Sequence, residues 1–331
     1  MDNLTHSLVG AVMGQAGLKK KTGLAMPALI IGANLPDVDA ACFFWLEGTE
    51  HLGLRRGITH GPIAWVVLPL ILAGLLWWFD RWQDRRGKRP EGRLPVSFKW
   101  LYLLSFIGCL SHPLFDWFNV YGIRFLEPFS SAWFYGDTLF IIDVWLWALL
   151  GFGTWFSMWR ERRCKPSRWP AALTIAAATA YIGGNWIVTE ASWVPYAINS
   201  KVVGAEGVGS PSEPNVPAEQ MIASPVPFWP HERELILGEH NNYFVIPPGT
   251  VPSPSTAKPI TDARCGWPDL TEVRVVNSQV DAFLFWSRAP FAGRAEDGSV
   301  ILYDARFYDP RARDRFSIAL PDVECVELGG E

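Results

Sequence analysis

The sequence predicts a mainly α-helical protein: a polytopic membrane helical bundle followed by a small β-rich extracytoplasmic domain. Two observations lead to this fold. Residues 1–190 hold most of the tryptophan and leucine in five or six apolar runs, whereas residues 191–331 hold most of the proline, aspartate and glutamate. Apolar runs that approach 20 residues are typical of membrane spans, and short alternating runs between turn residues are typical of strands.

Six apolar runs are visible in the first part: 4–18, 24–46, 62–79, 100–118, 138–158 and 170–188. The last four approach the length of roughly 20 residues that a helix needs to cross a bilayer. The first two are short or interrupted, by three lysines between them and by Pro36 inside the second. We expect these two to be short tilted helices or a re-entrant pair that is buried in protein.

Positive charge predicts the orientation of these segments. Basic residues concentrate in three connections: 19–21, 80–99 and 159–169. By the positive-inside rule these connections lie in the cytoplasm. Alternation then places residues 47–61, 117–137 and everything after 189 outside, so we expect a multi-pass protein of the cytoplasmic membrane.

Residues of the types that bind metals stand at or inside the ends of the apolar runs. They are His6, Asp37, Asp39, His60, His112 and Asp116. An ionisable group at membrane depth costs roughly 2.5–3.5 kcal/mol on insertion scales, so each is a functional candidate. Counted from the basic ends of four segments, the candidate groups, Asp143 among them, lie at a common height of about 18–25 Å for a rise of 1.5 Å per residue. We therefore predict one shared metal site near the outer surface.

The spacing of the motifs indicates how these ligands are presented. His112 and Asp116 are four residues apart and share one helical face, and Pro113 favours a kink or a helix start at the histidine. Asp37 and Asp39 are two apart, but Pro36 favours a turn that lets both carboxylates face inward. We expect one of them to ligate directly and the other to bridge metals or orient a histidine.

Three histidines with two or three carboxylates favour Zn²⁺, with Mn²⁺ or Fe²⁺ as alternatives, over Mg²⁺ and Ca²⁺, and one to three ions are compatible with the set. The expected chemistry is hydrolysis of an ester or phosphoester by metal-activated water, with a lipid or amphiphilic substrate. We expect Asp39, Arg56 and Asp143 to take part in catalysis, Arg56 by holding an anionic group. Asn119 and Asp137 are candidate further ligands or supports of ligands.

Other interpretations of the same residues stay open. Each histidine or aspartate taken alone can be an interfacial, turn or helix-start residue, and Arg56 can be a rim charge. The ligands can also form an ion site in a transporter, although no tandem hydropathy repeat is visible. A third interpretation is a non-catalytic membrane metal-binding protein, whose closed ligand shell leaves no position for water.

The motifs resemble those of the YdjM-like family, the LexA-regulated, membrane-bound, metal-dependent hydrolases of bacterial and archaeal inner membranes. The resemblance covers residues 1–190 and rests on Met-Asp-x-x-Thr-His at 1–6, Pro-Asp-x-Asp at 36–39, Arg-Gly-x-Thr-His at 56–60 and His-Pro-x-x-Asp at 112–116. It implies a metal-dependent hydrolase of the inner membrane. The chain departs from the pattern at Arg55, where a second histidine is common, and at Gly61, where serine is usual.

A fainter likeness, through the His-x-x-x-Asp pair, links these motifs to zinc-dependent phospholipase C and P1-type nucleases. It implies a phosphoesterase with several zinc ions. The net charge of −4 and the absence of a basic stripe with interleaved aromatics lead us to expect no nucleic-acid partner.

The C-terminal part divides into a Pro/Gly-rich linker at 191–230 without regular elements and a small β-rich soluble domain at 231–331. The alternating runs that predict its strands are 234–246, 271–277, 280–288, 299–308 and 315–320. Cys265 and Cys325 can form a disulfide if this domain faces an oxidising compartment. His231 and His240 are expected to be ordinary surface residues.

Overall fold

A computed structural model describes residues 1–195, 220–239, 242–260, 265–309 and 312–325. The chain divides into two compact units. The helical unit comprises Met1–Asp39 and Arg56–Trp186, and the β unit comprises Ala40–Arg55 and Ile187–Glu331. The short excursion Ala40–Arg55 into the β unit was not predicted, because nothing in its composition distinguishes it from the segments on either side.

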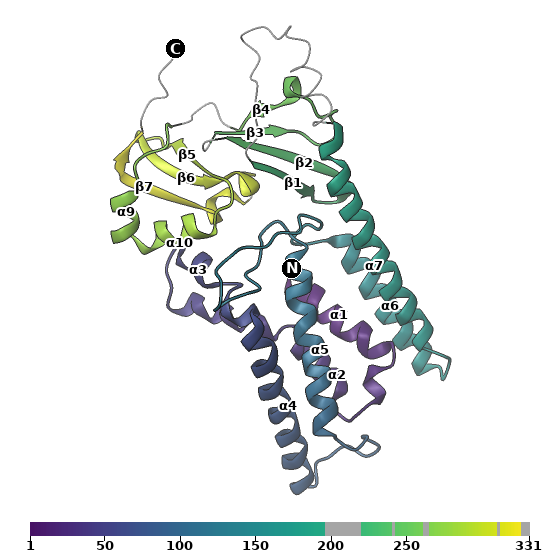
Figure 1. The fold of residues 1–331 in the computed structure, drawn as a ribbon. Coiled ribbons are helices and arrows are strands. Elements are labelled where there is room, and N and C mark those ends of the chain that lie inside the picture. Colours follow the sequence, from purple (N-terminus) through teal and green to yellow (C-terminus); the bar gives the residue numbers. More distant parts are fainter. Residues whose placement is uncertain (196–219, 240–241, 261–264, 310–311, 326–331) are drawn as a thin grey trace. The chain divides into compact units, whose positions relative to one another are not determined.

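The helical unit contains the predicted apolar runs as helices (Figure 1). They are α1 Asn3–Gln15, α2 Ala25–Gly32, α4 Pro62–Arg85, α5 Phe98–Trp117, α6 Val144–Arg162 and α7 Arg168–Ala191, with the 3₁₀ segments η1 Leu18–Lys20, η2 Leu35–Phe44, which runs on into the β unit, and η3 Ile58–His60. The run at 138–158 becomes helical only from Val144, because Asp143 is its N-cap and accepts a hydrogen bond from the Leu146 amide at 2.8 Å.

Two helices in the described part of the chain are long and apolar enough to cross a membrane, Pro62–Arg85 and the helix that starts at Arg168. A third span is possible if α2 and η2 act together, since they form one apolar pair that is bent by 52° at the break between them. This bent pair agrees with the broken or re-entrant segment that Pro36 predicts. Large apolar side chains on α4, among them Ile71, Leu75 and Trp78, are exposed, as expected of a lipid-facing helix.

Close backbone approach joins α2 to α1 and α5, the two helices that carry His6 and His112. A Cβ atom added to Gly10 of α1 would lie 2.7 Å from the carbonyl oxygen of Leu29 on α2, and one added to Gly108 of α5 would lie 2.6 Å from the same oxygen. Gly10 is one turn after His6 and Gly108 is one turn before His112, on the same helix faces. The two glycines therefore let α1 and α5 both approach the Leu29 carbonyl, and this brings their histidines together.

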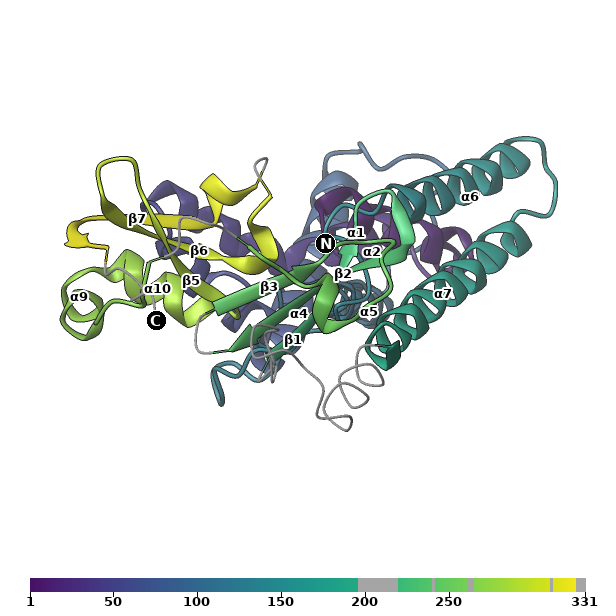
Figure 2. The same cartoon turned by 90° about the horizontal axis from the view of Figure 1, so that it is seen from above.

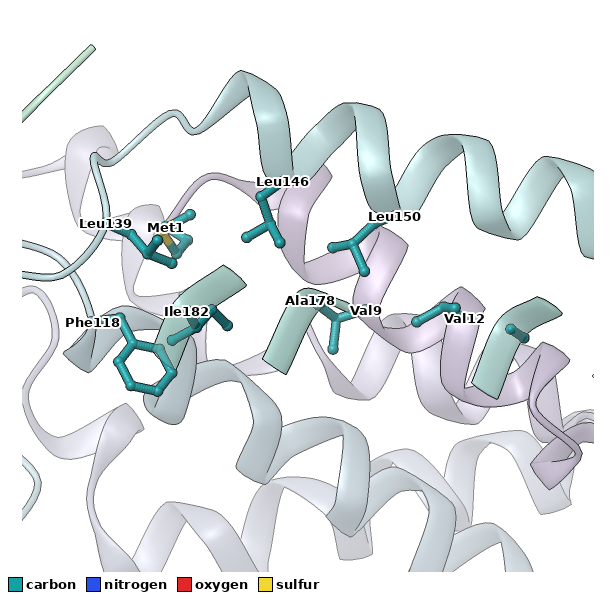
Figure 3. Packing of buried hydrophobic residues seen from close by; sticks show 10 residues of the cluster. Met1, Val9, Val12, Phe118, Leu139, Leu146, Leu150, Ala178 and Ile182 are labelled. Atoms are coloured by element: carbon teal, nitrogen blue, oxygen red, sulfur yellow. The ribbon is translucent and has the colours of Figure 1, made fainter. Parts of the chain in front are cut away.

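Apolar packing holds this arrangement in two clusters. One lies between α1, α5, α6 and α7 and is drawn in Figure 3; it contains Val9, Val12, Phe118, Leu146, Leu150 and Ile182. The other lies between α2, α4 and α5 and contains Ala28, Leu29, Leu72, Leu76, Leu101 and Leu104. Figures 1 and 2 both show α6 and α7 side by side, which agrees with their shared cluster.

The β unit contains two antiparallel sheets. The first has the order β1-β2-β3-β4, and the second has the order β5-β6-β7. Their strands are β1 Gln220–Val226, β2 Trp229–Glu239, β3 Asn242–Ile246, β4 Lys258–Pro259, β5 Pro290–Arg294, β6 Ser299–Asp304 and β7 Ser317–Glu324. The unit also holds the helices α3 Glu50–Leu54, α9 Thr271–Val276 and α10 Ser278–Trp286. Cys265 and Cys325 form a disulfide with their Cα atoms 5.3 Å apart.

Two predictions for this region are wrong. The runs at 271–277 and 280–288 are helices and not strands, because Val280, Phe283 and Trp286 repeat every three residues and bury one helical face, and the Asn277 side chain caps α10. The linker at 191–230 is not free of regular structure: β1 lies in it, since Ile222 pairs with Ile236 and both are fully buried. Residues 196–219 of that linker, and His240, lie outside the described residues.

Candidate metal centre

Four segments of the helical unit bring the predicted ligands to one point. His6 comes from α1, Asp37 from η2, His60 from η3, and His112 and Asp116 from α5. Two groups have candidate ligand atoms within 4.8 Å of one another: His6, Asp37 and His112, and His60, His112 and Asp116. Because His112 belongs to both groups, the two groups form a single centre.

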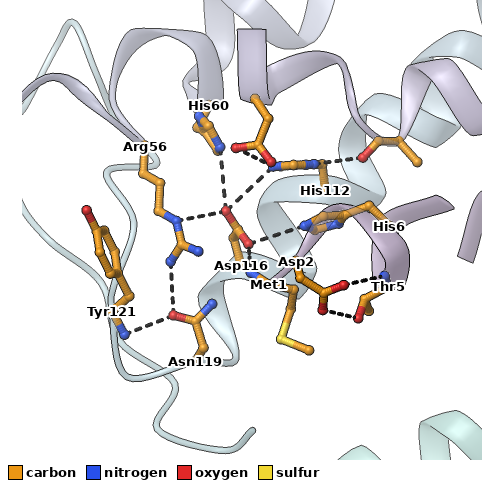
Figure 4. Close-up of polar contacts among 12 residues, drawn as sticks. Met1, Asp2, Thr5, His6, Arg56, His60, His112, Asp116, Asn119 and Tyr121 are labelled. Carbon is orange, nitrogen blue, oxygen red and sulfur yellow. Dashed lines mark hydrogen bonds and ion pairs between the residues drawn. The ribbon is translucent and has the colours of Figure 1, made fainter. Parts of the chain in front are cut away.

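Asp116 lies in the middle of this centre (Figure 4). Its Oδ1 is 3.4 Å from Nε2 of His6, and its Oδ2 is 3.6 Å from Nε2 of His60 and 3.5 Å from Nε2 of His112. The α-amino group of Met1 also pairs with Oδ1. The contact between His112 and Asp116 confirms the shared helical face that their spacing predicts.

Of the two expectations at His112, a kink or a helix start, the helix start is wrong. α5 runs without interruption from Phe98 to Trp117 and carries Pro113 in its interior. A proline at this position removes one helical hydrogen bond, to the carbonyl of Cys109, but the flanking turns continue the helix. The packing of α5 against α2 and α4 therefore outweighs the local preference of the residue before proline.

The histidine nitrogens are arranged as metal ligands. Nδ1 of His112 lies 2.7 Å from the carbonyl oxygen of Ala33, which must accept its proton and so leaves the Nε2 lone pair facing the centre. Nε2 of His6, His60 and His112 are buried and have no hydrogen-bond partner among the described residues, and all three face the Asp116 carboxylate. Buried polar atoms are almost always satisfied, so three converging nitrogens without partners fit a metal ion.

Asp37 and Asp39 have different places. Oδ1 of Asp37 is 3.7 Å from Nε2 of His112, whereas Oδ2 of Asp39 lies 3.6 Å from Nδ1 of His60, on the far side of that ring. Asp39 also accepts hydrogen bonds from the Arg56 amide at 2.8 Å and the Thr59 hydroxyl at 3.2 Å. Asp37 is thus placed as a ligand, and Asp39 as the carboxylate that orients His60.

His60 is the candidate ligand that lies just before the start of α4. Its imidazole is fully buried, and this burial lowers its pKa, against the opposing effect of the nearby carboxylates. The neutral imidazole is the form that binds metals. Thr59 and Asp39 set the orientation of this imidazole. The sequence motif shows Thr59 only as the neighbour of the histidine and does not indicate that it orients the ring.

Arg56 is buried beside Asp116 and is not at the rim of the site. Its Nε is 3.0 Å from Oδ2 of Asp116, one terminal nitrogen donates to Oδ1 of Asn119 at 2.9 Å and to the carbonyl of Gly122 at 3.1 Å, and the guanidinium lies over the ring of Tyr121. Its backbone has a left-handed φ of 56°, which a non-glycine residue adopts at an energetic cost. This cost is met by hydrogen bonds on both sides of the residue, to Asp39 and from the amide of Arg124.

Two predicted residues have other surroundings. Asp143 caps α6 and accepts a hydrogen bond from the Tyr181 hydroxyl at 2.9 Å, so its carboxylate is used at the helix start. Asp137 is buried in a left-handed turn with φ 47°, between Phe134 and Leu139, two residues whose bridges tie the segment to Ile123 and Asn119. Neither residue belongs to the two ligand groups found among the described residues.

Sequence reasoning missed further supports of the centre. Asp2 caps α1 and accepts hydrogen bonds from Thr5 and from the indole of Trp147, which fixes the helix turn that carries His6. The Asp-x-x-Thr spacing signals this cap. The Ala33 carbonyl has no sequence signal, because every residue carries one.

The departure at Gly61 has a structural reason. A Cβ atom at this position would overlap the carbonyl of Glu127, whose loop packs directly against the glycine. A serine at this position would require that loop to move. Position 61 therefore supplies no hydroxyl to the site. The hydroxyl that contacts His60 is that of Thr59, at 3.0 Å.

The comparison with known proteins agrees with these motifs. The family model described as "YdjM inner membrane protein" matches residues 1–191. One curated relative, the uncharacterized protein YfhP of Bacillus subtilis (strain 168), is 26% identical over 141 residues, which cover 40% of this chain and 39% of that protein. No solved structure matches the chain. With more than half of its length matched by the family model, the chain belongs to the YdjM inner membrane protein family.

Proposed function

We propose that the protein is a membrane-bound metal-dependent hydrolase that cleaves an ester or phosphoester of a lipid or amphiphilic substrate. The observation that carries this proposal is that three imidazole nitrogens converge on the buried Asp116 carboxylate. None of the three has a hydrogen-bond partner in the described part of the chain. This donor set suits Zn²⁺ or another divalent transition metal. When bound, such an ion lowers the pKa of a water molecule and polarises the substrate oxygen.

Each residue of the centre has a distinct task in this proposal. His6, Asp37, His60, His112 and Asp116 hold the metal, while Asp39 and Ala33 fix the orientation of His60 and His112. Arg56 neutralises the charge of the Asp116 carboxylate and holds it in place through their 3.0 Å ion pair. Asp37 is the most exposed of the ligands, at 10%, so access of water or substrate is expected on its side.

The proposal includes a location. The basic connections after α1, α4 and α6 favour the cytoplasm, so the centre lies toward the outer face of a multi-pass protein. The disulfide between Cys265 and Cys325 supports an extracytoplasmic β unit, because structural disulfides persist in oxidising compartments. A centre at this depth meets substrates that reside in the outer leaflet.

A second candidate is a metal site without catalysis. The side chains of His6, His60 and His112 are 0% exposed and that of Asp116 is 1% exposed, as in a closed structural site. Both candidates predict bound metal, and only the first predicts turnover. An ion transporter would need the metal to exchange across the membrane.

The first experiment is metal analysis of the purified full-length protein in detergent. We expect bound zinc in the wild type, loss of zinc in His112→Ala and Asp116→Asn, and retention in Asp84→Asn, which removes an exposed carboxylate at the cytoplasmic end of α4. Absence of any transition metal in the wild type after zinc loading would refute the metal centre.

The second experiment measures turnover. Zinc-loaded protein in vesicles is offered phosphatidic acid, diacyl phospholipids and long-chain p-nitrophenyl esters, with Asp116→Asn as the inactive control. Release of phosphate, headgroup or nitrophenol by the wild type alone supports the hydrolase. Stoichiometric metal with no release from any of these substrates supports the structural site, and zinc uptake into vesicles supports a transporter.

A further inference from the structure

We propose that Asn119 is a catalytic residue whose amide nitrogen donates a hydrogen bond to an anionic oxygen of the substrate at the metal centre. This inference rests on the proposed hydrolase function and assigns its substrate a phosphoryl or comparable oxyanion. It differs from a role for Asn119 as a metal ligand, which the geometry of its amide disfavours.

The orientation of the Asn119 amide is determined by its neighbours. Two donors face one end of the group: the guanidinium of Arg56 at 2.9 Å and the backbone amide of Tyr121 at 2.9 Å. Only an oxygen can accept from both, so Oδ1 occupies this end and the amide nitrogen occupies the other. Figure 4 shows the oxygen toward Arg56 and Tyr121 and the nitrogen on the opposite side, toward Asp116.

The amide nitrogen has nothing to bond to among the described residues. Asn119 is 0% exposed, and its Nδ2 has no hydrogen-bond partner in that part of the chain. A buried donor without a partner is unfavourable, because it has given up its hydrogen bond to water and gained none in return. The oxygen of the same side chain accepts two hydrogen bonds, so a purely structural role accounts for Oδ1. It does not account for the buried Nδ2.

The position of this donor relates it to the metal centre. Asn119 follows Asp116 by three residues at the end of α5, and its oxygen is joined to Asp116 through the single guanidinium of Arg56. A neutral amide nitrogen donates hydrogen bonds and does not ligate a metal, so the bonding partner that suits it is an acceptor oxygen. An oxyanion that develops during hydrolysis is such an acceptor, and a fixed donor stabilises it without reorganisation.

Two variants separate donation from mere positioning of Arg56. Asn119→Asp keeps an acceptor for Arg56 and Tyr121 but replaces the donor nitrogen with oxygen. Asn119→Ala removes both and adds no charge. The probe is inorganic phosphate, whose affinity for the zinc-loaded full-length protein is measured by titration calorimetry, with zinc content determined for each variant.

We expect both variants to retain zinc and to bind phosphate roughly 10- to 100-fold more weakly than the wild type, as expected for a lost hydrogen bond to a charged group. If Asn119→Asp binds phosphate as tightly as the wild type, only the support of Arg56 matters. If Asn119→Ala does so, any weaker binding by Asn119→Asp comes from its added negative charge and not from the lost donor. Either result overturns the inference, as does a zinc-loaded wild type that binds no phosphate.

The same titration distinguishes this inference from the proposed function. If the wild type binds phosphate through Asn119 but hydrolyses none of the offered esters, the donor role stands and the hydrolase assignment fails. If esters are hydrolysed, Asn119→Ala is expected to lower kcat roughly 10²- to 10³-fold, the usual effect of removing one oxyanion donor. Hydrolysis at the wild-type rate in both variants would refute the donor role and leave the hydrolase intact.

Discussion

Gly108 offers a test of how helix packing builds the centre. In Gly108→Ala, the new Cβ would lie 2.6 Å from the Leu29 carbonyl oxygen and 3.0 Å from the Ala33 amide nitrogen. Ordinary contact begins at 3.4 Å, so α2 and α5 must separate by 3.4 − 2.6 = 0.8 Å. Overpacking of this kind typically costs about 1–3 kcal/mol of folding free energy.

The same displacement reaches a ligand. The carbonyl of Ala33 accepts from Nδ1 of His112 at 2.7 Å, and a shift of 0.8 Å along that direction would lengthen this contact to 3.5 Å, beyond hydrogen-bond range. Loss of such support typically lowers metal affinity about 10- to 100-fold. We therefore expect Gly108→Ala to lower both the unfolding midpoint in detergent and the zinc affinity measured by competition with a chelating dye.

Gly151→Ala is the matched control. It makes the same change in the interior of α6, where the added Cβ has no atom within 4 Å. Replacing a helical glycine by alanine there should leave zinc affinity unchanged and raise stability by up to about 1 kcal/mol. If Gly108→Ala matches Gly151→Ala in both measurements, the close approach of α2 and α5 does not support His112 and the reasoning is refuted.

Three further predictions concern the supports of the centre and the β unit. Asp39→Asn should weaken zinc binding about 10- to 100-fold by loosening His60, and Asp37→Asn should weaken it further because a ligand is lost; equal effects in a zinc titration would contradict separate roles for the two carboxylates. Cys265→Ser opens a disulfide whose cysteines are 60 residues apart, and should destabilise the β unit by about 2–4 kcal/mol, measured as the loss of a reductant-dependent shift in its unfolding; no dependence on reductant in the wild type would count against the disulfide. Asp304 is fully buried, which raises its pKa, but Arg306 at 2.7 Å and Ser287 outweigh burial and hold the pKa below its usual 3.8. A group whose pKa is lower in the folded state stabilises that state above its unfolded pKa, so the β unit should lose stability as the pH falls below about 3.8, and Asp304→Asn should flatten that acid limb of the stability curve.

The sequence predicts much of the ligand set but not its internal division of labour. His6, His60, His112 and Asp116 stand out because ionisable groups inside apolar runs are costly, and all four meet in the structure. Asp37 and Asp39 look equivalent in the motif, yet they face different histidines, since η2 turns one toward α5 and the other toward η3. The depth of Asp143 matches that of the ligands and so suggests a catalytic group, whereas a helix start uses its carboxylate.

The β unit shows where local pattern is insufficient. A run such as 280–288 is apolar on average and can be interpreted as a strand, but the burial of Val280, Phe283 and Trp286 shows a helical period. β1 has proline and serine among its seven residues and is stabilised by pairing with β2 more than by its own composition. The period and the cap of α10 lie within its own sequence, whereas β1 depends on pairing with β2 across a turn, which a window confined to β1 does not contain.

By itself the sequence determined the apolar helices, the broken second segment and the identity of the candidate metal-binding side chains, because hydrophobicity, proline and charge act over a few neighbouring residues. The tertiary structure alone decided which atoms converge. Gly10 and Gly108 let two helices approach the Leu29 carbonyl, the Ala33 carbonyl selects the nitrogen of His112 that faces the centre, and two donors orient the Asn119 amide. These are backbone approaches and hydrogen-bond directions between distant segments, and they exist only once the helices have packed.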